Sequence, residues 1–187
     1  LELLYEQLDT LKDDDVLVLA GSIPSGMPQS IYRDIMSRLQ SKRIKIAVDA
    51  TKDLLMNVLA YHPFVIKPNN HELSEIFDIM IDSKEKAVVH AKELQKKGAQ
   101  NVIVSMAGEG AVFVGSDGSV FTSEAPHGVV KNSVGAGDSM VAGFLAGYLA
   151  KGDYAEAFKM GLCTGSASAF SDQLATREEV EQVRRSH

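Results

Sequence analysis

Short apolar runs that alternate with helical segments constrain this chain more than any other feature. The run at residues 16–20 reads Val-Leu-Val-Leu-Ala, and an uninterrupted run of this length suits a strand buried on both faces of a sheet. The predicted strands are 16–20, 44–48, 64–66, 102–104 and 111–114. The predicted helices are 1–11, 28–41, 53–60, 72–80, 83–97, 138–150, 154–171 and a last one from Thr176. This alternation predicts an α/β protein with a mainly parallel sheet.

Local signals mark the ends of several predicted elements. Pro28 suits the first position of a helix, where its missing N–H costs least. Gly115-Ser116-Asp117-Gly118 predicts a hairpin turn that leads into Val120, so the last strands should form an antiparallel pair at one edge of the sheet. Thr176 and Glu179 fit a capping box, in which each side chain bonds to the other residue's backbone N–H.

Composition narrows the class of partner. The chain has 187 residues, a length that suits a single domain over 1–187. Its 19 Lys and Arg against 25 Asp and Glu give a net charge of −6, which argues against broad electrostatic capture of nucleic acid or of an anionic membrane. The one cysteine, Cys163, permits no internal disulfide. We therefore expect a cytoplasmic protein that binds neither nucleic acid nor membrane.

Polar residues and glycines cluster where the predicted strands end. Ligands of open α/β sheets bind beyond the carboxyl ends of the strands, so these clusters indicate where chemistry occurs. The clusters are 21–26, 49–52, 67–72, 105–110 and the glycine-rich turn 135–138.

The sharpest of them is Gly135-Ala136-Gly137-Asp138, which opens an apolar helix. Free backbone N–H groups at such a helix start can bind an anion, because the positive end of the helix dipole reinforces them. Asp138 is placed to take a proton from a hydroxyl that attacks a bound phosphate. The alternative is an ordinary glycine turn in which Asp138 is a favourable first-turn charge.

The segment Lys67-Pro68-Asn69-Asn70-His71-Glu72 follows a predicted buried strand. Asn69 and Glu72 lie three residues apart at a helix start, so their oxygens can converge on a hydrated magnesium ion. The alternative is that the two residues form a capping box. Further along, Ser105-Met106-Ala107-Gly108-Glu109-Gly110 offers two glycines that let backbone approach a ligand closely, or else a tight turn.

Other nucleotide signatures and metal spacings are missing. The chain has no Walker A sequence, and Met140 stands where a dinucleotide-binding motif starting at Gly135 would need glycine. The five histidines are scattered without metal-ligand spacing. Small residues on a late helix either make room for an adenine or allow close helix packing; they are Gly161, Gly165, Ser166, Ala167 and Ser168.

Four motifs occur in one order along the chain. They are Gly21-Ser22-Ile23-Pro24-x-Gly26, Lys67-Pro68-Asn69-x-x-Glu72-Leu73, Ser105-x-x-Gly108-x-Gly110-Ala111 and Val134-Gly135-Ala136-Gly137-Asp138-Ser139. This ordered set resembles the ribokinase-like (PfkB) family of sugar kinases. Within the family, the chain looks like the branch of 1-phosphofructokinases and tagatose-6-phosphate kinases. The resemblance implies a three-layer α/β/α fold with a mainly parallel sheet and an antiparallel edge pair.

The resemblance also implies a role for each site residue. Asp138 resembles the catalytic base, and Gly135, Ala136 and Gly137 resemble the anion hole for the transferring phosphoryl group. Asn69 and Glu72 resemble residues of the magnesium site. The residues that resemble the ATP-binding set are Lys67, Ser105, Met106, Ala107, Gly108, Glu109, Gly110 and Asn132.

By this resemblance we expect phosphoryl transfer from ATP, with Mg²⁺, to a ketohexose phosphate. The favoured reaction converts fructose 1-phosphate to fructose 1,6-bisphosphate. The open alternatives are tagatose 6-phosphate as substrate, or a nucleotide-binding fragment without catalysis. Family members carry further N-terminal strands and a β lid, so we expect Leu1 to align inside the family domain and the 187 residues to form its C-terminal portion. A homodimer is expected for the full-length protein.

Overall fold

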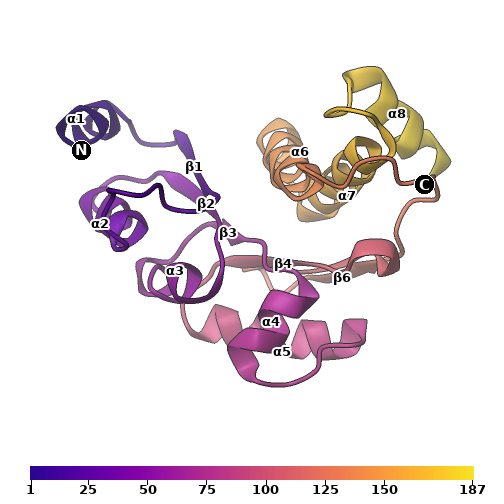
Figure 1. Ribbon diagram of the computed structural model, residues 1–187, viewed down its shortest axis with the longest axis horizontal. Helices are drawn as coiled ribbons and strands as arrows, with labels where there is room; N and C mark the ends of the chain where they lie inside the picture. The colour runs from indigo at the N-terminus through magenta and orange to yellow at the C-terminus, as the bar shows by residue number, and fades with distance from the viewer.

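The computed structural model describes residues 1–187, and a six-stranded sheet runs through its centre (Figure 1). The strands lie in chain order, β1-β2-β3-β4-β5-β6. The first four are parallel, whereas β5 and β6 continue the sheet in antiparallel pairings. Their bounds are Val16–Ala20, Lys45–Asp49, Val65–Ile66, Asn101–Ser105, Ala111–Val114 and Val120–Ser123. The predicted architecture is therefore confirmed, including the antiparallel pair at one edge.

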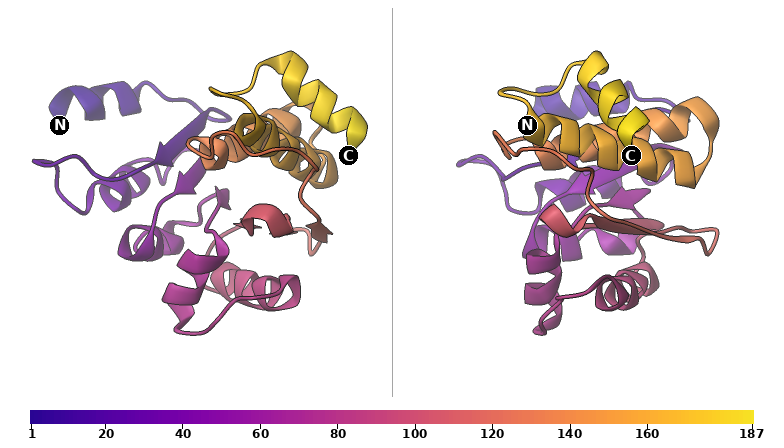
Figure 2. Two further views of the ribbon diagram at one scale, coloured as in Figure 1. Left: turned by 45° about the vertical axis from the view of Figure 1, so that its right-hand side comes forward. Right: turned by 90° about the vertical axis from the view of Figure 1, so that its right-hand side faces the viewer.

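Helices cover both faces of the sheet, which gives three layers (Figure 2). The longer helices α6 and α7 pack side by side on one face, and α2 to α5 lie on the other. The helices up to the middle of the chain are α1 Glu2–Asp9, α2 Ile31–Arg38, α3 Lys52–Met56, α4 Asn70–Phe77 and α5 Lys84–Lys96. The last three are α6 Ala136–Lys151, α7 Tyr154–Phe170 and α8 Arg177–Ser186. Short 3₁₀ turns occupy Leu59–Tyr61 and Ala107–Glu109.

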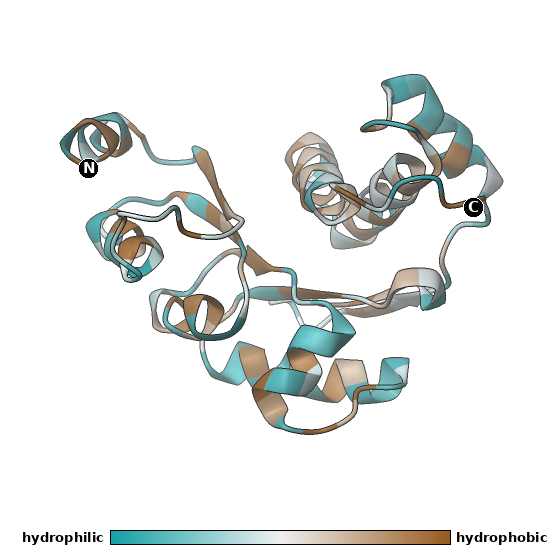
Figure 3. Ribbon diagram, viewed as in Figure 1, coloured by the Kyte–Doolittle hydropathy of each residue, from teal (hydrophilic) through white to brown (hydrophobic).

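Alternation of side chains along the strands builds two separate hydrophobic cores. In β4, Val102 and Val104 face the core under α4 and α5, while Ile103 faces the core under α6 and α7. Successive strand residues point to opposite faces, so one continuous apolar run supplies both cores. Figure 3 shows the strands as largely hydrophobic and α8 as mainly hydrophilic. This division into two cores explains why β4 and β5 read as unbroken apolar segments.

The expectation that residues 16–20 are buried on both faces is wrong. Strand β1 lies at the edge of the sheet, and Val18 is 46% exposed while Leu19 is buried. On the side of α6 and α7, Val16 packs against the core and is partly buried, whereas Val18, further along the same face of β1, is left exposed. Composition of the run identified a strand but not the coverage of its faces.

Several predicted helix bounds also differ from the structure; the helix predicted over 72–80, for example, is α4 Asn70–Phe77. The helix predicted to start at Pro28 begins at Ile31, because Pro28 belongs to a preceding turn in which its carbonyl accepts from the Ile31 N–H. The helix predicted over 53–60 is split into α3 and a 3₁₀ turn. The capping box of Thr176 and Glu179 is confirmed at the start of α8. No helix is both long enough and apolar enough to span a bilayer.

Candidate active site

A buried ion pair joins the ends of two neighbouring strands. Asp49 ends β2 and Lys67 follows β3, one position beyond the paired residues Val48 and Ile66. Lys67 Nζ lies 3.3 Å from Asp49 Oδ2, and the two side chains are only 7% and 18% exposed. Since carboxyl ends of parallel strands meet at one edge of the sheet, the register itself brings the two charges together.

The first turn of α6 sits directly over this pair. A Cβ built on Gly137 would lie 3.1 Å from Lys67 Nζ and 4.0 Å from Asp49 Oδ2. Burial raises the pKa of Asp49, and the negative charge of Asp138 adds to that rise, whereas Lys67 opposes both. The site thus holds two carboxylates from different elements with one ammonium group buried between β3 and α6.

Gly135 makes the sharp entry into α6. It is the N-cap residue with φ of +79°, a left-handed conformation that strains any residue with a Cβ. The first helical residues Ala136, Gly137 and Asp138 follow it, and their N–H groups have no partner within the helix. The carboxylate of Asp138 is exposed beside them. The predicted anion-binding residues and the predicted base therefore share one helix turn that is open to solvent.

Asn69 and Glu72 form the capping box that the sequence left as an alternative. Asn69 Oδ1 accepts from the Glu72 N–H, and Glu72 Oε2 accepts from the Asn69 N–H, both over 2.8 Å. The capping bond uses Oε2 and leaves Oε1 available to a hydrated cation. No cluster of three or more His, Cys, Asp or Glu side chains that could hold a metal directly is present. The donors therefore fit magnesium through water, with one carboxylate, rather than a closed protein cage.

The turn after β4 lies beside the start of α4. Asn69 and Ser105 form an isolated parallel bridge, so the segments 67–72 and 105–110 run next to each other. Gly110 has a φ of +92°, and a Cβ there would lie 2.0 Å from the carbonyl oxygen of Ser123. Only glycine fits at that position, which holds this turn close to the end of β6. Met106 is 3% exposed, because its side chain packs into the hydrophobic core and not toward a ligand at this turn.

A pocket of about 660 Å³ connects these segments. Its walls come from the start of α4, the turn after β4, the segment 124–130, the first turn of α6 and the face of α7 that carries Gly165 and Ser166. This volume is in the range of small-molecule sites. The residues predicted for the site that line the pocket are Asn69, Ser105, Ala107, Gly108, Gly110, Ala136 and Gly137.

Other predicted residues lie outside the pocket lining. Lys67 is buried against Asp49, and Glu109 is exposed to solvent next to the pocket turn. Asn132 spends its side chain on a local turn, where Oδ1 accepts from the Val134 N–H over 3.0 Å. Gly135, Asp138 and Glu72 stand at its border, adjacent in sequence or by hydrogen bond to residues that line it.

Sequence reasoning left two parts of the site incomplete. It placed Asp49 in the cluster 49–52 but assigned it no role, although its position one residue past the apolar run was a usable signal. The wall formed by 124–130 was missed entirely, because this segment has no regular periodicity. Its Gly128 packs so closely on Phe170 that a Cβ there would lie 2.4 Å from the ring.

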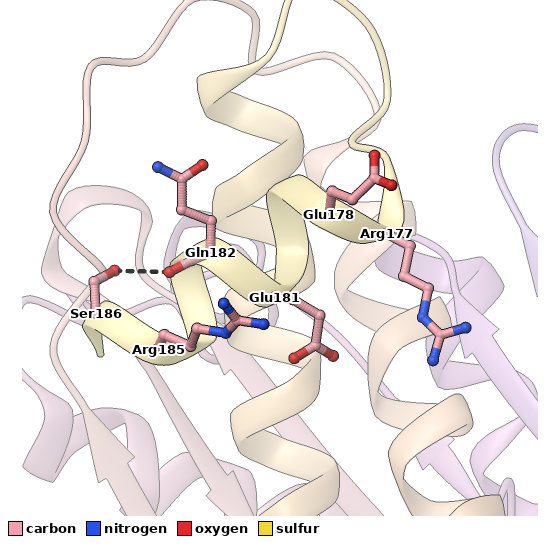
Figure 4. Close-up of a pocket in the computed structure, with 6 residues that line it drawn as sticks. All are labelled: Arg177, Glu178, Glu181, Gln182, Arg185 and Ser186. Atoms are coloured by element: carbon pink, nitrogen blue, oxygen red, sulfur yellow. Dashed lines mark hydrogen bonds between the residues drawn. The ribbon is translucent and has the colours of Figure 1, made fainter.

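A second depression lies along α8 and is unrelated to the sheet ends. Its six lining residues all belong to that one helix: Arg177, Glu178, Glu181, Gln182, Arg185 and Ser186. Figure 4 shows these side chains spread along the helix surface, with Ser186 Oγ donating to the Gln182 carbonyl oxygen over 3.2 Å. Charges of both signs on one solvated helix face carry no pattern for a ligand.

Comparison with known proteins assigns the family. The profile of the pfkB family of carbohydrate kinases matches residues 1–179. The chain is 44% identical over 178 residues to a 1-phosphofructokinase of Bacillus subtilis, covering 95% of this chain and 58% of that protein. It is 30% identical over 168 residues to a D-tagatose-1-phosphate kinase of Bacillus licheniformis, covering 89% of this chain and 55% of the relative.

Solved structures agree with this assignment. A Staphylococcus aureus protein assigned as a phosphofructokinase superposes with a TM-score of 0.93 at 37% identity, over 99% of this chain and 60% of that one. Arabidopsis thaliana ribokinase, at 16% identity, shares the fold with a TM-score of 0.76 over 91% of this chain and 55% of that one. The chain thus spans about three fifths of the length of the proteins it matches. Its fold is ribokinase-like, and the chain belongs to the pfkB family of carbohydrate kinases.

Proposed function

We propose that residues 1–187 form the nucleotide-binding and catalytic unit of an ATP-dependent sugar-phosphate kinase. The observation that carries the proposal is the first turn of α6, where Asp138 stands beside the backbone N–H groups of Gly135 and Gly137, which have no hydrogen-bond partner, at the border of the pocket. The 44% identity to a 1-phosphofructokinase supports fructose 1-phosphate as the acceptor and fructose 1,6-bisphosphate as the product.

In this mechanism the Asp138 carboxylate takes the proton of the acceptor hydroxyl as its oxygen attacks the γ-phosphorus of ATP. The new oxygen–phosphorus bond forms while the bond to the β,γ-bridging oxygen breaks, and ADP leaves. The N–H groups of Ala136 and Gly137 stabilise charge on the transferring group, because donors fixed in advance need no reorganisation. Phosphoryl transfer needs little covalent chemistry from a protein beyond such positioning.

The remaining residues hold the nucleotide and its cation. The turn Ser105–Gly110 and the wall 124–130 line the pocket in which we place ATP. Asn69 and Glu72 would hold Mg²⁺ through water, and the ion would neutralise charge on the phosphates. Lys67 acts from beneath Gly137 as a fixed positive charge rather than by entering the pocket.

A second candidate acceptor is tagatose 1-phosphate, since one relative at 30% identity is a D-tagatose-1-phosphate kinase. Fructose 1-phosphate and tagatose 1-phosphate differ only in configuration at C4, and both offer a free 6-hydroxyl. Tagatose 6-phosphate, the alternative drawn from the sequence, offers its 1-hydroxyl instead. A third possibility is nucleotide binding without transfer. The resemblance also implies a homodimer for the full-length protein. Size-exclusion chromatography with light scattering would measure its molar mass and so test this expectation.

The test is a coupled ADP-release assay with Mg-ATP and the three sugar phosphates in parallel. We expect ADP release to be fastest with fructose 1-phosphate. Faster release with tagatose 1-phosphate would reassign the substrate within the same mechanism. Nucleotide binding without ADP release on any sugar phosphate would contradict the kinase proposal for this chain and favour a nucleotide-binding protein.

A further inference from the structure

A buried chain of hydrogen bonds lies behind residues 135–138, the turn at the start of α6 that we call the anion-binding turn. The Ala175 N–H donates to Ser168 Oγ over 3.1 Å, and the Ser168 hydroxyl donates to Ser139 Oγ over 2.8 Å. Ser139 and Ser168 are 9% and 2% exposed. Ser139 directly follows Asp138 in α6, Ser168 belongs to α7, and Ala175 precedes α8. We call these three groups the serine bridge.

The bridge stands in an interface where α6 and α7 approach each other very closely. A Cβ on Gly165 would lie 3.0 Å from the carbonyl oxygen of Ala136, and one on Gly161 would lie 2.8 Å from that of Met140. Burying a hydroxyl costs free energy unless it is hydrogen-bonded, so two hydroxyls here need each other. Their bond also has a fixed direction, which apolar contact lacks. It therefore ties the first turn of α6 to one position on α7.

The loop between α7 and α8, which carries Ala175, also contacts the anion-binding turn from its outer side. Leu174 lies over Gly135, such that a Cβ on Gly135 would be 2.7 Å from Leu174 Cδ2. The Asn132 amide donates to the Asp172 carbonyl oxygen over 3.4 Å, which joins the loop to the segment that enters the turn. The loop between α7 and α8 thus contacts the anion-binding turn from both its outer side and its entry.

We propose that Ser168 is a positioning residue: through the serine bridge it fixes the first turn of α6, and so holds Asp138 and the N–H groups of residues 135–137 in reactive geometry. The inference rests on the proposed kinase function and deepens it. Ser168 touches no substrate in this scheme. It acts through Ser139 and through the loop that carries Leu174.

The first test does not depend on activity. Amide hydrogen exchange of Ser139, whose N–H donates to the Gly135 carbonyl oxygen over 2.9 Å, is compared in the native chain, Ser168→Ala and Ser171→Ala. Ser171 is a matched control, because it is a buried serine of the same region whose Oγ donates to the Ala167 carbonyl oxygen and which takes no part in the serine bridge. We expect exchange at Ser139 to rise about tenfold in Ser168→Ala and to stay unchanged in Ser171→Ala. The shift of the Gly137 amide signal on titration with AMP-PNP should weaken in Ser168→Ala alone.

The second test uses turnover with Mg-ATP and fructose 1-phosphate. We expect Ser168→Ala to lower kcat by about tenfold to a hundredfold, since small misplacement of reacting groups costs this much. The KM for ATP should change little, because the pocket walls at 105–110 and 124–130 are untouched. Should Ser168→Ala fail to fold, Ser168→Cys keeps a weak donor of similar size and should show the same effects in weaker form.

Each outcome decides the inference. Equal Ser139 exchange and equal kcat in the native chain and Ser168→Ala would overturn it, as would equal losses in Ser168→Ala and Ser171→Ala. If the native chain shows no turnover, the kinase proposal fails, while Ser139 exchange and the Gly137 shift still decide whether Ser168 positions the turn.

Discussion

The ammonium group of Lys67 lies 3.3 Å from the carboxylate of Asp49, and both are enclosed beneath Gly137. The pair links the strands β2 and β3 to the first turn of α6, so it joins the sheet to the turn that we propose binds phosphate. Removing one partner of a buried ion pair leaves the other charge uncompensated, which destabilises a protein strongly. We therefore expect the pair to stabilise the structure around the first turn of α6.

Lys67→Met should lower the free energy of unfolding by about 3 kcal/mol near neutral pH. Without Lys67, burial and Asp138 raise the pKa of Asp49 unopposed. A folded-state pKa above the unfolded value gives stability that is present at low pH and lost as pH rises through the folded pKa. The gap between variant and native chain should therefore be small near about pH 4 and widen toward about pH 7.5.

Urea unfolding at several pH values measures this gap. Lys45→Met is the control, because Lys45 is on the neighbouring strand and its contact to the exposed Asp14 is 3.9 Å long. Such a pair contributes at most about 1 kcal/mol. If the loss of stability in Lys67→Met did not depend on pH, it would contradict the inference that Lys67 compensates the buried charge of Asp49.

Gly135→Ala should impair both folding and phosphate binding. The alanine would have to adopt a φ of +79°, and its Cβ would lie 2.7 Å from Leu174 Cδ2. We therefore expect the free energy of unfolding to fall by about 1–3 kcal/mol. Gly152→Ala is a matched control at the other end of α6, with a φ of +66° and open space around it. Calorimetric titration with AMP-PNP should detect weaker binding for Gly135→Ala only. Equal affinity in both variants would show that the turn does not contact the phosphates.

Asn69→Ala and Glu72→Gln separate the cap from the cation site. Asn69→Ala removes the acceptor for the Glu72 N–H and should cost about 1 kcal/mol of stability. Glu72→Gln keeps an oxygen for the Asn69 N–H but loses the charge, so stability should change little. The Mg²⁺ concentration that supports half-maximal AMP-PNP binding should rise about tenfold in Glu72→Gln. An unchanged Mg²⁺ requirement would leave Glu72 with a capping role alone.

The regular parts of the fold were predictable because their signals are local. Alternating or continuous apolar runs identified the strands, and the pairs Asn69 with Glu72 and Thr176 with Glu179 marked helix starts. Polar residues at strand ends predicted the candidate site, and the structure places several of them around one pocket because parallel strands bring those ends together. The exposure of Val18 was not predictable, because coverage of a strand depends on where helices far along the chain pack.

The remaining parts of the site depend on contacts between distant segments. The pairing of Asp49 with Lys67 requires the register of β2 against β3, and that of Ser139 with Ser168 requires the packing of α6 on α7. The burial of Met106 follows from the direction of one turn after β4. No periodicity in the sequence encodes these relationships, so they emerge only from the folded chain.

We propose above all that Asp138 is the base of a phosphoryl transfer and is not needed to hold the nucleotide. Its most direct test compares the native chain with Asp138→Asn, measuring ADP release with fructose 1-phosphate and AMP-PNP affinity on the same preparations. We predict that kcat falls between about a hundredfold and ten-thousandfold while the affinity stays within about twofold. Turnover within tenfold of the native rate, or loss of AMP-PNP binding by a folded variant, would contradict the claim.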